Sequence, residues 1–288
     1  MAKRPTPSDQ EPIQQIATAP QTDPAATLRS ELMASSSIIH TLGRGAHGKS
    51  FWARWSIGRA QNAGRDIIIA DFDSMNQTLH ACYGDQRCVI PISAEEADVE
   101  DCLRQIAEQL MEQPRTALID AGAGDSTLKR VSRKLGGAVE FYEENGVIPV
   151  AVHFIGPHLD DLAYLRDLEP QPGASDPIER KGLFAPKRTI LVLNEALVPK
   201  GHAVDHFFKP VTDHPVFQAA VGRGAQMVYM PRLEEARLIE LKNLDFIAAE
   251  RGEPGQDGTR LGPWNRTYIR QWRQRMETNH AAVLEWLP

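Results

Sequence analysis

The stretch Gly43-Arg44-Gly45-Ala46-His47-Gly48-Lys49-Ser50 decides the fold of this chain, because it fits the pattern G-x-x-x-x-G-K-[ST]. A short strand is expected before it at residues 36–41, and the segment Phe51–Trp55 can open a helix after it. In this setting the glycines let backbone N–H groups approach phosphate oxygens, and the start of the helix favours an anion. A glycine turn with a capping serine is the alternative, and the flanking strand and helix argue against it. The stretch therefore predicts a loop that binds the phosphates of a nucleotide.

Individual residues of this loop have expected tasks. Lys49 is expected to reach the β and γ phosphates, and the Ser50 hydroxyl to ligate Mg²⁺. His47 is interpreted as a solvent-facing variable position rather than as a base. The residues expected to contact the nucleotide come from the loop and the first turn of the helix: Gly43, Gly45, Ala46, His47, Gly48, Lys49, Ser50 and Phe51.

The composition limits the class of protein. The 288 residues carry a net charge of −6, which argues against a protein that coats nucleic acid but allows a local basic patch. The three cysteines form no C-x-x-C pair, which suits a reducing cytoplasm and argues against disulfides or a cysteine-bound metal. No apolar run reaches the ~18 residues needed to span a bilayer, and no signal peptide is visible at the start. We expect a cytoplasmic protein.

Three segments are expected along the chain. Residues 1–30 are rich in Pro, Gln, Thr and Asp, which predicts a disordered arm. Residues 31–250 alternate short β-branched runs with helical patterns, and residues 251–288 form a helical extension. Strands are expected near residues 36–41, 66–72, 87–92, 115–120, 147–155, 188–193 and 226–230. Helices are expected at residues 94–112 and 158–168, and a surface loop at 171–187. This order predicts a single α/β P-loop NTPase domain with a mostly parallel, twisted sheet covered by helices on both faces.

Two aspartates, Asp71 and Asp73, follow the second expected strand as a D-x-D motif. Ligands on open parallel sheets bind at the carboxyl ends of the strands, so both carboxylates are expected to face the terminal phosphate. One carboxylate there can orient or deprotonate the attacking water, and Asp73 is also expected to belong to the metal site. The alternative is that an aspartate here caps a helix or a turn.

A third aspartate, Asp120, ends the apolar strand at residues 115–120, and Gly124 follows four residues later. An aspartate at this place is expected to hold the Mg²⁺ shell, usually through water, while the small residues let the loop sense the γ-phosphate. A strand-end aspartate before a glycine turn is the alternative.

Together these motifs resemble the deviant Walker A ATPases of the ParA/MinD family, the plasmid-partition and division-site members of the SIMIBI class of P-loop proteins. The family pattern K-G-G-x-G-K-[ST] falls on Arg44 to Ser50, the D-x-D of switch I on Asp71 and Asp73, and the D-x-x-x-G of switch II on Asp120 and Gly124. The resemblance covers about residues 35–249. It implies ATP as the nucleotide, Mg²⁺ as its metal, and Asp73 as the residue that orients water.

The resemblance extends to two segments that contact the base in the family. The strand that ends at Asn194 resembles the one that carries the family's adenine-reading asparagine. Pro231 resembles the proline loop that flanks the base. For Asn194, a plain turn residue is the alternative.

One position departs from the family pattern. The signature lysine, which reaches across a nucleotide-sandwich dimer to the partner's phosphates, is Arg44 here, and the glycine two residues later is Ala46. Arginine keeps the charge and offers a planar fork suited to phosphate, so Arg44 can act catalytically in trans within an ATP-bound homodimer. The alternative is that Arg44 is too bulky for the dimer seam, which leaves a protein that binds ATP but hydrolyses it slowly.

The last segment carries aromatic and basic residues at helical spacing. Trp264, Tyr268 and Trp272 are expected to form one face that packs on the body of the protein. The other face is either solvated or binds DNA phosphates without sequence preference. This second face contains Arg266, Arg270 and Arg273.

The resemblance implies an ATP-dependent, dimerising molecular switch that hydrolyses ATP to ADP and phosphate and acts in plasmid DNA partition or conjugative transfer. The expected partner is a DNA-bound adaptor or a relaxase-type protein. Two alternatives stay open. One is a regulator of envelope or polysaccharide machinery with the same fold, and the other is an ATP-binding scaffold with little turnover.

Overall fold

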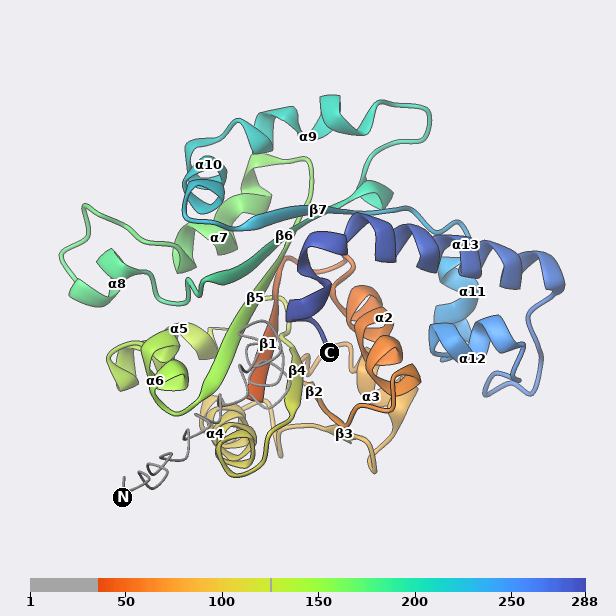
Figure 1. The fold of residues 1–288 in the computed structure, drawn as a ribbon, viewed down its shortest axis with the longest axis horizontal. Helices are drawn as coiled ribbons and strands as arrows, with labels where there is room; N and C mark the ends of the chain where they lie inside the picture. Colours follow the sequence, from red (N-terminus) through yellow and green to blue (C-terminus); the bar gives the residue numbers. More distant parts are fainter. Residues whose placement is uncertain (1–35, 125) are drawn as a thin grey trace, which may run out of the picture. The chain divides into compact units, whose positions relative to one another are not determined.

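The computed structural model describes residues 36–124 and 126–288, so the predicted arm at residues 1–30 lies outside the described residues. Seven strands form one sheet in the order β3-β2-β4-β1-β5-β6-β7 (Figure 1). All neighbouring strands pair in parallel. The strands are β1 (Ser36–Gly43), β2 (Ile67–Asp71), β3 (Cys88–Val89), β4 (Thr116–Asp120), β5 (Val147–Ile155), β6 (Arg188–Asn194) and β7 (Gln226–Met230). The predicted fold class is confirmed, and the strand at residues 87–92 is shorter than expected.

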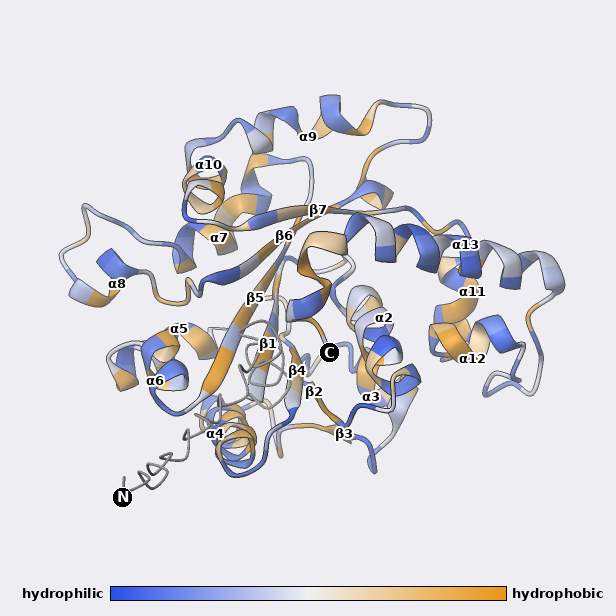
Figure 2. Cartoon of the chain, viewed as in Figure 1, coloured by the Kyte–Doolittle hydropathy of each residue, from blue (hydrophilic) through white to orange (hydrophobic). Residues whose placement is uncertain are grey.

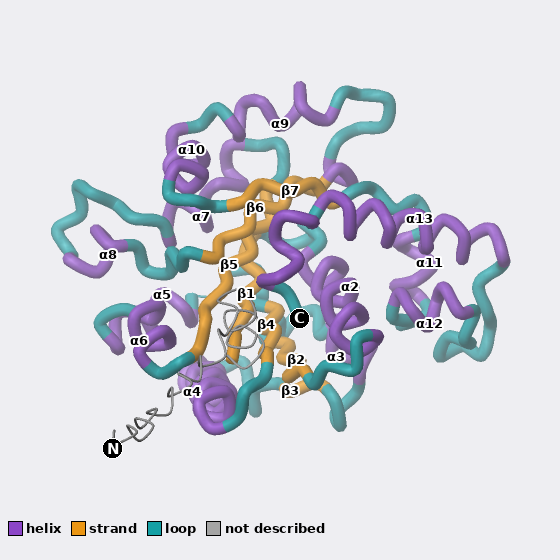
Figure 3. The backbone as a smooth tube through the Cα atoms, in the orientation of Figure 1, coloured by secondary structure: helices purple, strands orange, loops and turns teal. Residues whose placement is uncertain are grey.

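Helices alternate with the strands and cover both faces of the sheet (Figures 1 and 3). The longer ones are α2 (Lys49–Asn62), α4 (Glu96–Glu112), α5 (Thr127–Leu135), α9 (Val204–Thr212), α10 (Pro215–Gly222) and α13 (Pro263–Asn279). The shorter ones are α3 (Thr78–Tyr83), α6 (Ala138–Glu144), α7 (Ala163–Leu168), α8 (Pro177–Lys181), α11 (Ala236–Leu241) and α12 (Phe246–Arg251). Three 3₁₀ turns are η1 (Leu159–Leu162), η2 (Glu195–Leu197) and η3 (Ala281–Trp286).

Apolar side chains on both faces of the central strands hold these layers together. In β1, the adjacent residues Ile38 and Ile39 are both fully buried, although successive side chains point to opposite faces of a strand. Ile39 belongs to a core formed with α2, α12 and α13, and Ile38 to a core formed with α4 and α6. Figure 2 shows the resulting apolar centre of the sheet. A strand buried on both faces needs a continuous apolar run, which is why the strands could be found from sequence.

Two predicted segments differ from expectation. The loop expected at residues 171–187 contains the short helix α8, which Pro177 starts and Asp176 caps by accepting a hydrogen bond from the Ile178 amide at 2.9 Å. The end of this segment is not a surface loop either, because Phe184 is fully buried in the core. The single helix expected at residues 158–168 is instead the 3₁₀ turn η1 followed by α7.

Helix α13 packs on the same core as the P-loop helix, but through a different face from the one predicted. Ile269, Trp272 and Met276 are buried, whereas the side chains of Trp264 and Tyr268 are 77% and 44% exposed. The predicted aromatic face is therefore wrong at its first two positions. A repeat of four residues advances about 40° beyond a full helical turn at each step, so it leaves the buried face, while the spacing 269, 272, 276 stays on it.

The end of the chain is tied to α2 by hydrogen bonds as well as by packing. Trp52 Nε1 donates to His280 Nε2 at 3.0 Å, and both side chains are buried. Arg59 Nη1 donates to the Pro288 carbonyl oxygen at 3.1 Å. Among the described residues, no helix has both the length and the hydrophobicity required to cross a bilayer.

Candidate functional site

The loop between β1 and α2 has the backbone that its glycines permit. Gly43 and Gly48 have φ angles of 137° and 91°, in the left-handed region where other residues are strained. A Cβ atom at Gly43 would lie 2.6 Å from the Phe154 carbonyl oxygen. A Cβ atom at Gly48 would lie 2.5 Å from the Met230 Cε atom and 2.8 Å from an amide nitrogen of Asn194. Glycine is therefore required at both ends of the loop by its close packing on the neighbouring strand ends.

The ammonium group of Lys49 lies inside this loop. The residue is 6% exposed, and Nζ donates to the carbonyl oxygens of Gly43 and Arg44 at 3.1 Å each. Burial lowers the pKa of Lys49, and the carboxylates of Asp120 and Asp73 oppose that shift. The predicted lysine and two of the three predicted aspartates thus meet at one place, at the carboxyl ends of β1, β2 and β4.

Asp120 is a buried acid of the site, with 1% of its surface exposed. Its Oδ1 atom accepts a hydrogen bond from Thr41 Oγ1 at 2.6 Å, while its buried Oδ2 atom has no hydrogen-bond partner. Burial raises the pKa of Asp120, and the Ser50 and Thr41 hydroxyls and Lys49 oppose that shift. An unpartnered buried carboxylate oxygen beside a serine hydroxyl fits a hard cation with oxygen ligands, as predicted for Mg²⁺. Within the described residues, no three His, Cys, Asp or Glu side chains cluster as a metal site built from protein alone.

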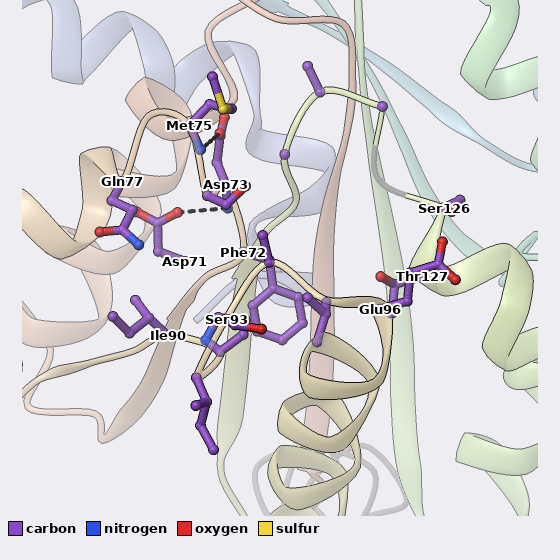
Figure 4. A pocket seen from close by; sticks show the side chains of 18 of the residues that line it. Asp71, Phe72, Asp73, Met75, Gln77, Ile90, Ser93, Glu96, Ser126 and Thr127 are labelled. Atoms are coloured by element: carbon purple, nitrogen blue, oxygen red, sulfur yellow. Dashed lines mark hydrogen bonds between the residues drawn. The ribbon is translucent and has the colours of Figure 1, made fainter.

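The two aspartates after β2 have different surroundings (Figure 4). Asp71 is buried, and its carboxylate accepts from the backbone amides of Asp73, Leu79 and His80 at 2.9–3.1 Å. Burial raises the pKa of Asp71 to about 6, against these hydrogen bonds. Asp71 therefore caps the start of α3 by accepting from the amides of Leu79 and His80, which is the alternative that the sequence left open.

Asp73, in contrast, is half-buried and lines two cavities. Its Oδ1 atom accepts from the amides of Met75 and Asn76 at 3.0 Å each, which holds the carboxylate at the turn. One cavity of about 850 Å³ extends from the P-loop to Asn243. The other, of about 510 Å³, lies between this turn, residues 90–94 and the start of α5 (Figure 4). Asp73 is thus the carboxylate placed to meet a ligand of the P-loop.

The loop after β4 lies against both neighbouring loops. A Cβ atom at Gly45 would lie 3.5 Å from Ala123 Cβ, and one at Gly122 would lie 3.2 Å from the Asp73 Cα atom. Gly124 has a φ angle of 86°, and its amide donates to the Tyr164 hydroxyl. The predicted switch segments and the P-loop are therefore in contact with one another.

The two predicted base-contacting residues both make hydrogen bonds within the framework. Asn194 is 4% exposed; its Nδ2 atom donates to the His47 carbonyl oxygen, and its Oδ1 atom accepts from the Ala196 amide, both at 2.9 Å. The Pro231 carbonyl oxygen accepts from Trp272 Nε1 at 2.7 Å. Neither residue lines the cavity that adjoins the P-loop. Each polar atom of the Asn194 side chain thus already makes one hydrogen bond to backbone.

Asp161 is a site residue that the sequence did not indicate. It is 3% exposed and lies 3.2 Å from Arg44 Nη1 and 3.1 Å from His47 Nε2, measured to its Oδ1 atom. The side chain of His47 is only 13% exposed, so the prediction that it faces solvent is wrong. No motif marks Asp161, because its partners are more than 100 positions away in the chain.

The three arginines of α13 that were predicted as a DNA-binding face are largely occupied. Arg270 and Arg273 both pair with Glu250, at 2.9 and 2.5 Å, and Arg266 donates to the Arg251 carbonyl oxygen at 3.4 Å. Two of the three predicted DNA-contacting charges therefore share one carboxylate.

No protein-family model matches this chain, and no curated protein matches it. Among solved structures, the chain is similar to the MinC:MinD cell division protein complex of Aquifex aeolicus, with 12% identity and a TM-score of 0.44 over 84% of this chain and 96% of that one. It is also similar to chloroplast FtsY of Physcomitrella patens, with 11% identity and a TM-score of 0.38 over 68% and 58% of the two chains. It is similar as well to FlhF complexed with GTP/Mg(2+), with 10% identity and a TM-score of 0.39 over 72% of this chain and 75% of that one.

Proposed function

We propose that the chain is a nucleotide-dependent switch that binds ATP with Mg²⁺ and hydrolyses it to ADP and phosphate. The observation that carries this proposal is the convergence of a buried P-loop lysine, a buried carboxylate oxygen without a partner, and a second carboxylate facing the adjoining cavity. Charged groups of both signs brought together at the ends of three parallel strands are what phosphoryl transfer requires.

Each residue has a defined part in this proposal. Lys49 leaves the carbonyl oxygens of the loop and binds the terminal phosphates. Ser50 and Asp120 are the residues that would hold Mg²⁺, which neutralises phosphate charge when bound. Asp73 accepts a hydrogen bond from the attacking water and orients it. The amides of the P-loop stabilise the negative charge that develops on the phosphate oxygens.

At the level of the cell, we propose a ParA/MinD-type ATPase that forms a homodimer around ATP and acts in plasmid partition or conjugative transfer. The support is the order of the P-loop, D-x-D and D-x-x-x-G motifs in the sequence. The partner in this proposal is a DNA-bound adaptor or a relaxase-type protein. In that dimer, Arg44 reaches the phosphates of the other protomer. Light scattering should therefore show that ATP dimerises the wild type more strongly than it dimerises Arg44→Ala.

A scaffold that binds ATP with little turnover is the second candidate. It is favoured by the contact of Arg44 with Asp161, which holds the arginine in its own protomer. The two candidates share the binding site and differ in the rate of hydrolysis, so a turnover measurement separates them.

The test compares ATP and GTP binding by calorimetry in the wild type and in Lys49→Ala. The substitution removes the positive charge that binds the terminal phosphates, so we expect the affinity for ATP to fall at least about 100-fold. Exposed Lys200, which pairs with Glu234, offers the matched control: Lys200→Ala keeps wild-type affinity. Equal affinity of wild type and Lys49→Ala removes the P-loop assignment, and preference for GTP corrects the proposed nucleotide.

A further inference from the structure

A buried carboxylate outside the predicted motifs holds two side chains of the P-loop. Asp161 lies in η1, just after β5, and is 3% exposed. Its Oδ1 atom is 3.2 Å from Arg44 Nη1 and 3.1 Å from His47 Nε2. Its Oδ2 atom accepts from the His158 amide at 3.1 Å, which fixes the carboxylate on its own turn. One acid thus connects the turn after β5 to the first and fourth variable positions of the loop.

The ring of His47 is fixed from both sides. Its Nδ1 atom is 2.8 Å from the Gly45 carbonyl oxygen, which only accepts, so Nδ1 carries a hydrogen. Its Nε2 atom faces the Asp161 carboxylate. The ring therefore spans from the backbone of the P-loop to the turn after β5.

Gly156 shows that this contact is tightly packed. A Cβ atom there would lie 2.4 Å from Asp161 Oδ2 and 2.9 Å from His47 Nε2. Any larger residue at position 156 would separate the carboxylate from the ring.

We propose that Asp161 is a positioning residue for phosphate binding. By holding Arg44 and His47, it orders the P-loop before the nucleotide arrives, so that its amides already point at the place of the phosphates. The hydrogen bond from Arg44 to this buried acid is charge-assisted, and such bonds are strong. A loop that is ordered in advance loses less entropy on binding. This inference concerns the regulation of the proposed nucleotide site and rests on that function.

The contact can be tested with two neighbouring aspartates. Asp161→Asn keeps the shape and removes the charge, and Asp160→Asn makes the same change at an exposed position. In the nucleotide-free protein, we expect amide hydrogen exchange over residues 44–50 to be faster in Asp161→Asn and unchanged in Asp160→Asn. With a fluorescent ATP analogue, we expect Asp161→Asn to bind about 10-fold more weakly and Asp160→Asn to bind like the wild type.

A double-mutant cycle separates positioning from a general loss of stability. If Asp161 acts through its two partners, Asp161→Asn weakens binding far less in an Arg44→Ala, His47→Ala background than in the wild type. Equal effects in both backgrounds overturn the proposal. So does affinity in Asp161→Asn equal to or above that of the wild type, or P-loop exchange that does not change.

Two further measurements keep the test decisive. If Asp161→Asn does not fold, the single variants Arg44→Ala and His47→Ala must reproduce the faster exchange, and their failure to do so overturns the proposal. If the wild type binds no nucleotide, the proposed function fails, while the exchange measurement still decides whether Asp161 orders the loop.

Discussion

The P-loop and helix α13 both carry positive side chains, but they hold them in opposite ways. Lys49 is 6% exposed, donates hydrogen bonds to two carbonyl oxygens and lies near two carboxylates. Arg270 is 55% exposed and shares Glu250 with Arg273. A surface pair of this kind contributes at most about 1 kcal/mol, whereas a buried charge strongly favours any partner that neutralises it. The comparison indicates that the burial of a charged side chain, more than its residue type, decides whether it is suited to bind a ligand.

The largest effect tests the same rule within α13 itself. Trp272 is 2% exposed and donates to the Pro231 carbonyl oxygen, while Trp264 is 77% exposed. We expect Trp272→Ala to reduce the free energy of unfolding by about 3–5 kcal/mol, because it leaves a cavity and an unpartnered carbonyl. Trp264→Ala is expected to change it by less than about 0.5 kcal/mol. Urea unfolding of both variants measures the two values, and similar losses would break the comparison.

The second effect compares two carboxylates. Asp73 lines the cavity that adjoins the P-loop, whereas Glu250 pairs with arginines of α13. We expect Asp73→Ala to keep ATP binding and to lower turnover by about 10²- to 10⁴-fold, because the attacking water loses its acceptor. Glu250→Ala is expected to leave both unchanged. Phosphate release at saturating ATP gives the rates, and turnover that survives in Asp73→Ala would assign another base.

The third effect depends on pH. His40 and His153 are buried, and burial lowers the pKa of each to about 3. In the unfolded chain both imidazoles bind a proton near pH 6.5, whereas in the folded chain they stay neutral down to about pH 3. The free energy of unfolding is therefore highest above pH 6.5 and decreases as the pH falls from 6.5 towards 3. At pH 5 each therefore costs about 2 kcal/mol of stability. We expect His153→Leu to remove its own half of this combined loss between pH 7 and pH 5 in thermal unfolding, and His206→Leu, at an exposed position, to retain the whole loss.

The smallest effect concerns DNA and the surface charges of α13. Because Arg270 and Arg273 share Glu250, we expect only weak, ATP-enhanced binding to duplex DNA at low salt. Each arginine that contacts a phosphate adds about 0.9 to the slope of log affinity against log salt, so Arg270→Ala should lower that slope by about 1. Gel shifts over a salt series measure it. No shift at micromolar protein means that this helix only packs.

The sequence predicted the elements that local pattern controls. Parallel strands buried on both faces need apolar runs, and the P-loop needs glycine where φ is positive, so both could be located by residue number. The surroundings of single polar side chains could not be found this way. Whether Asp71 faces a ligand or binds the first amides of α3 depends on where α3 begins. The contacts of His47 with Asp161 and of Asn194 with His47 were missed because only the folded sheet brings these distant segments together.

The hydrogen bond between Trp52 and His280 joins positions 228 residues apart. At about 5–20 residues per second, a ribosome needs roughly 11–46 s to make the chain between them. Throughout that time the tryptophan of α2 lacks the helix that covers it. The growing polypeptide therefore carries an uncovered apolar surface next to the phosphate loop until α13 has been made.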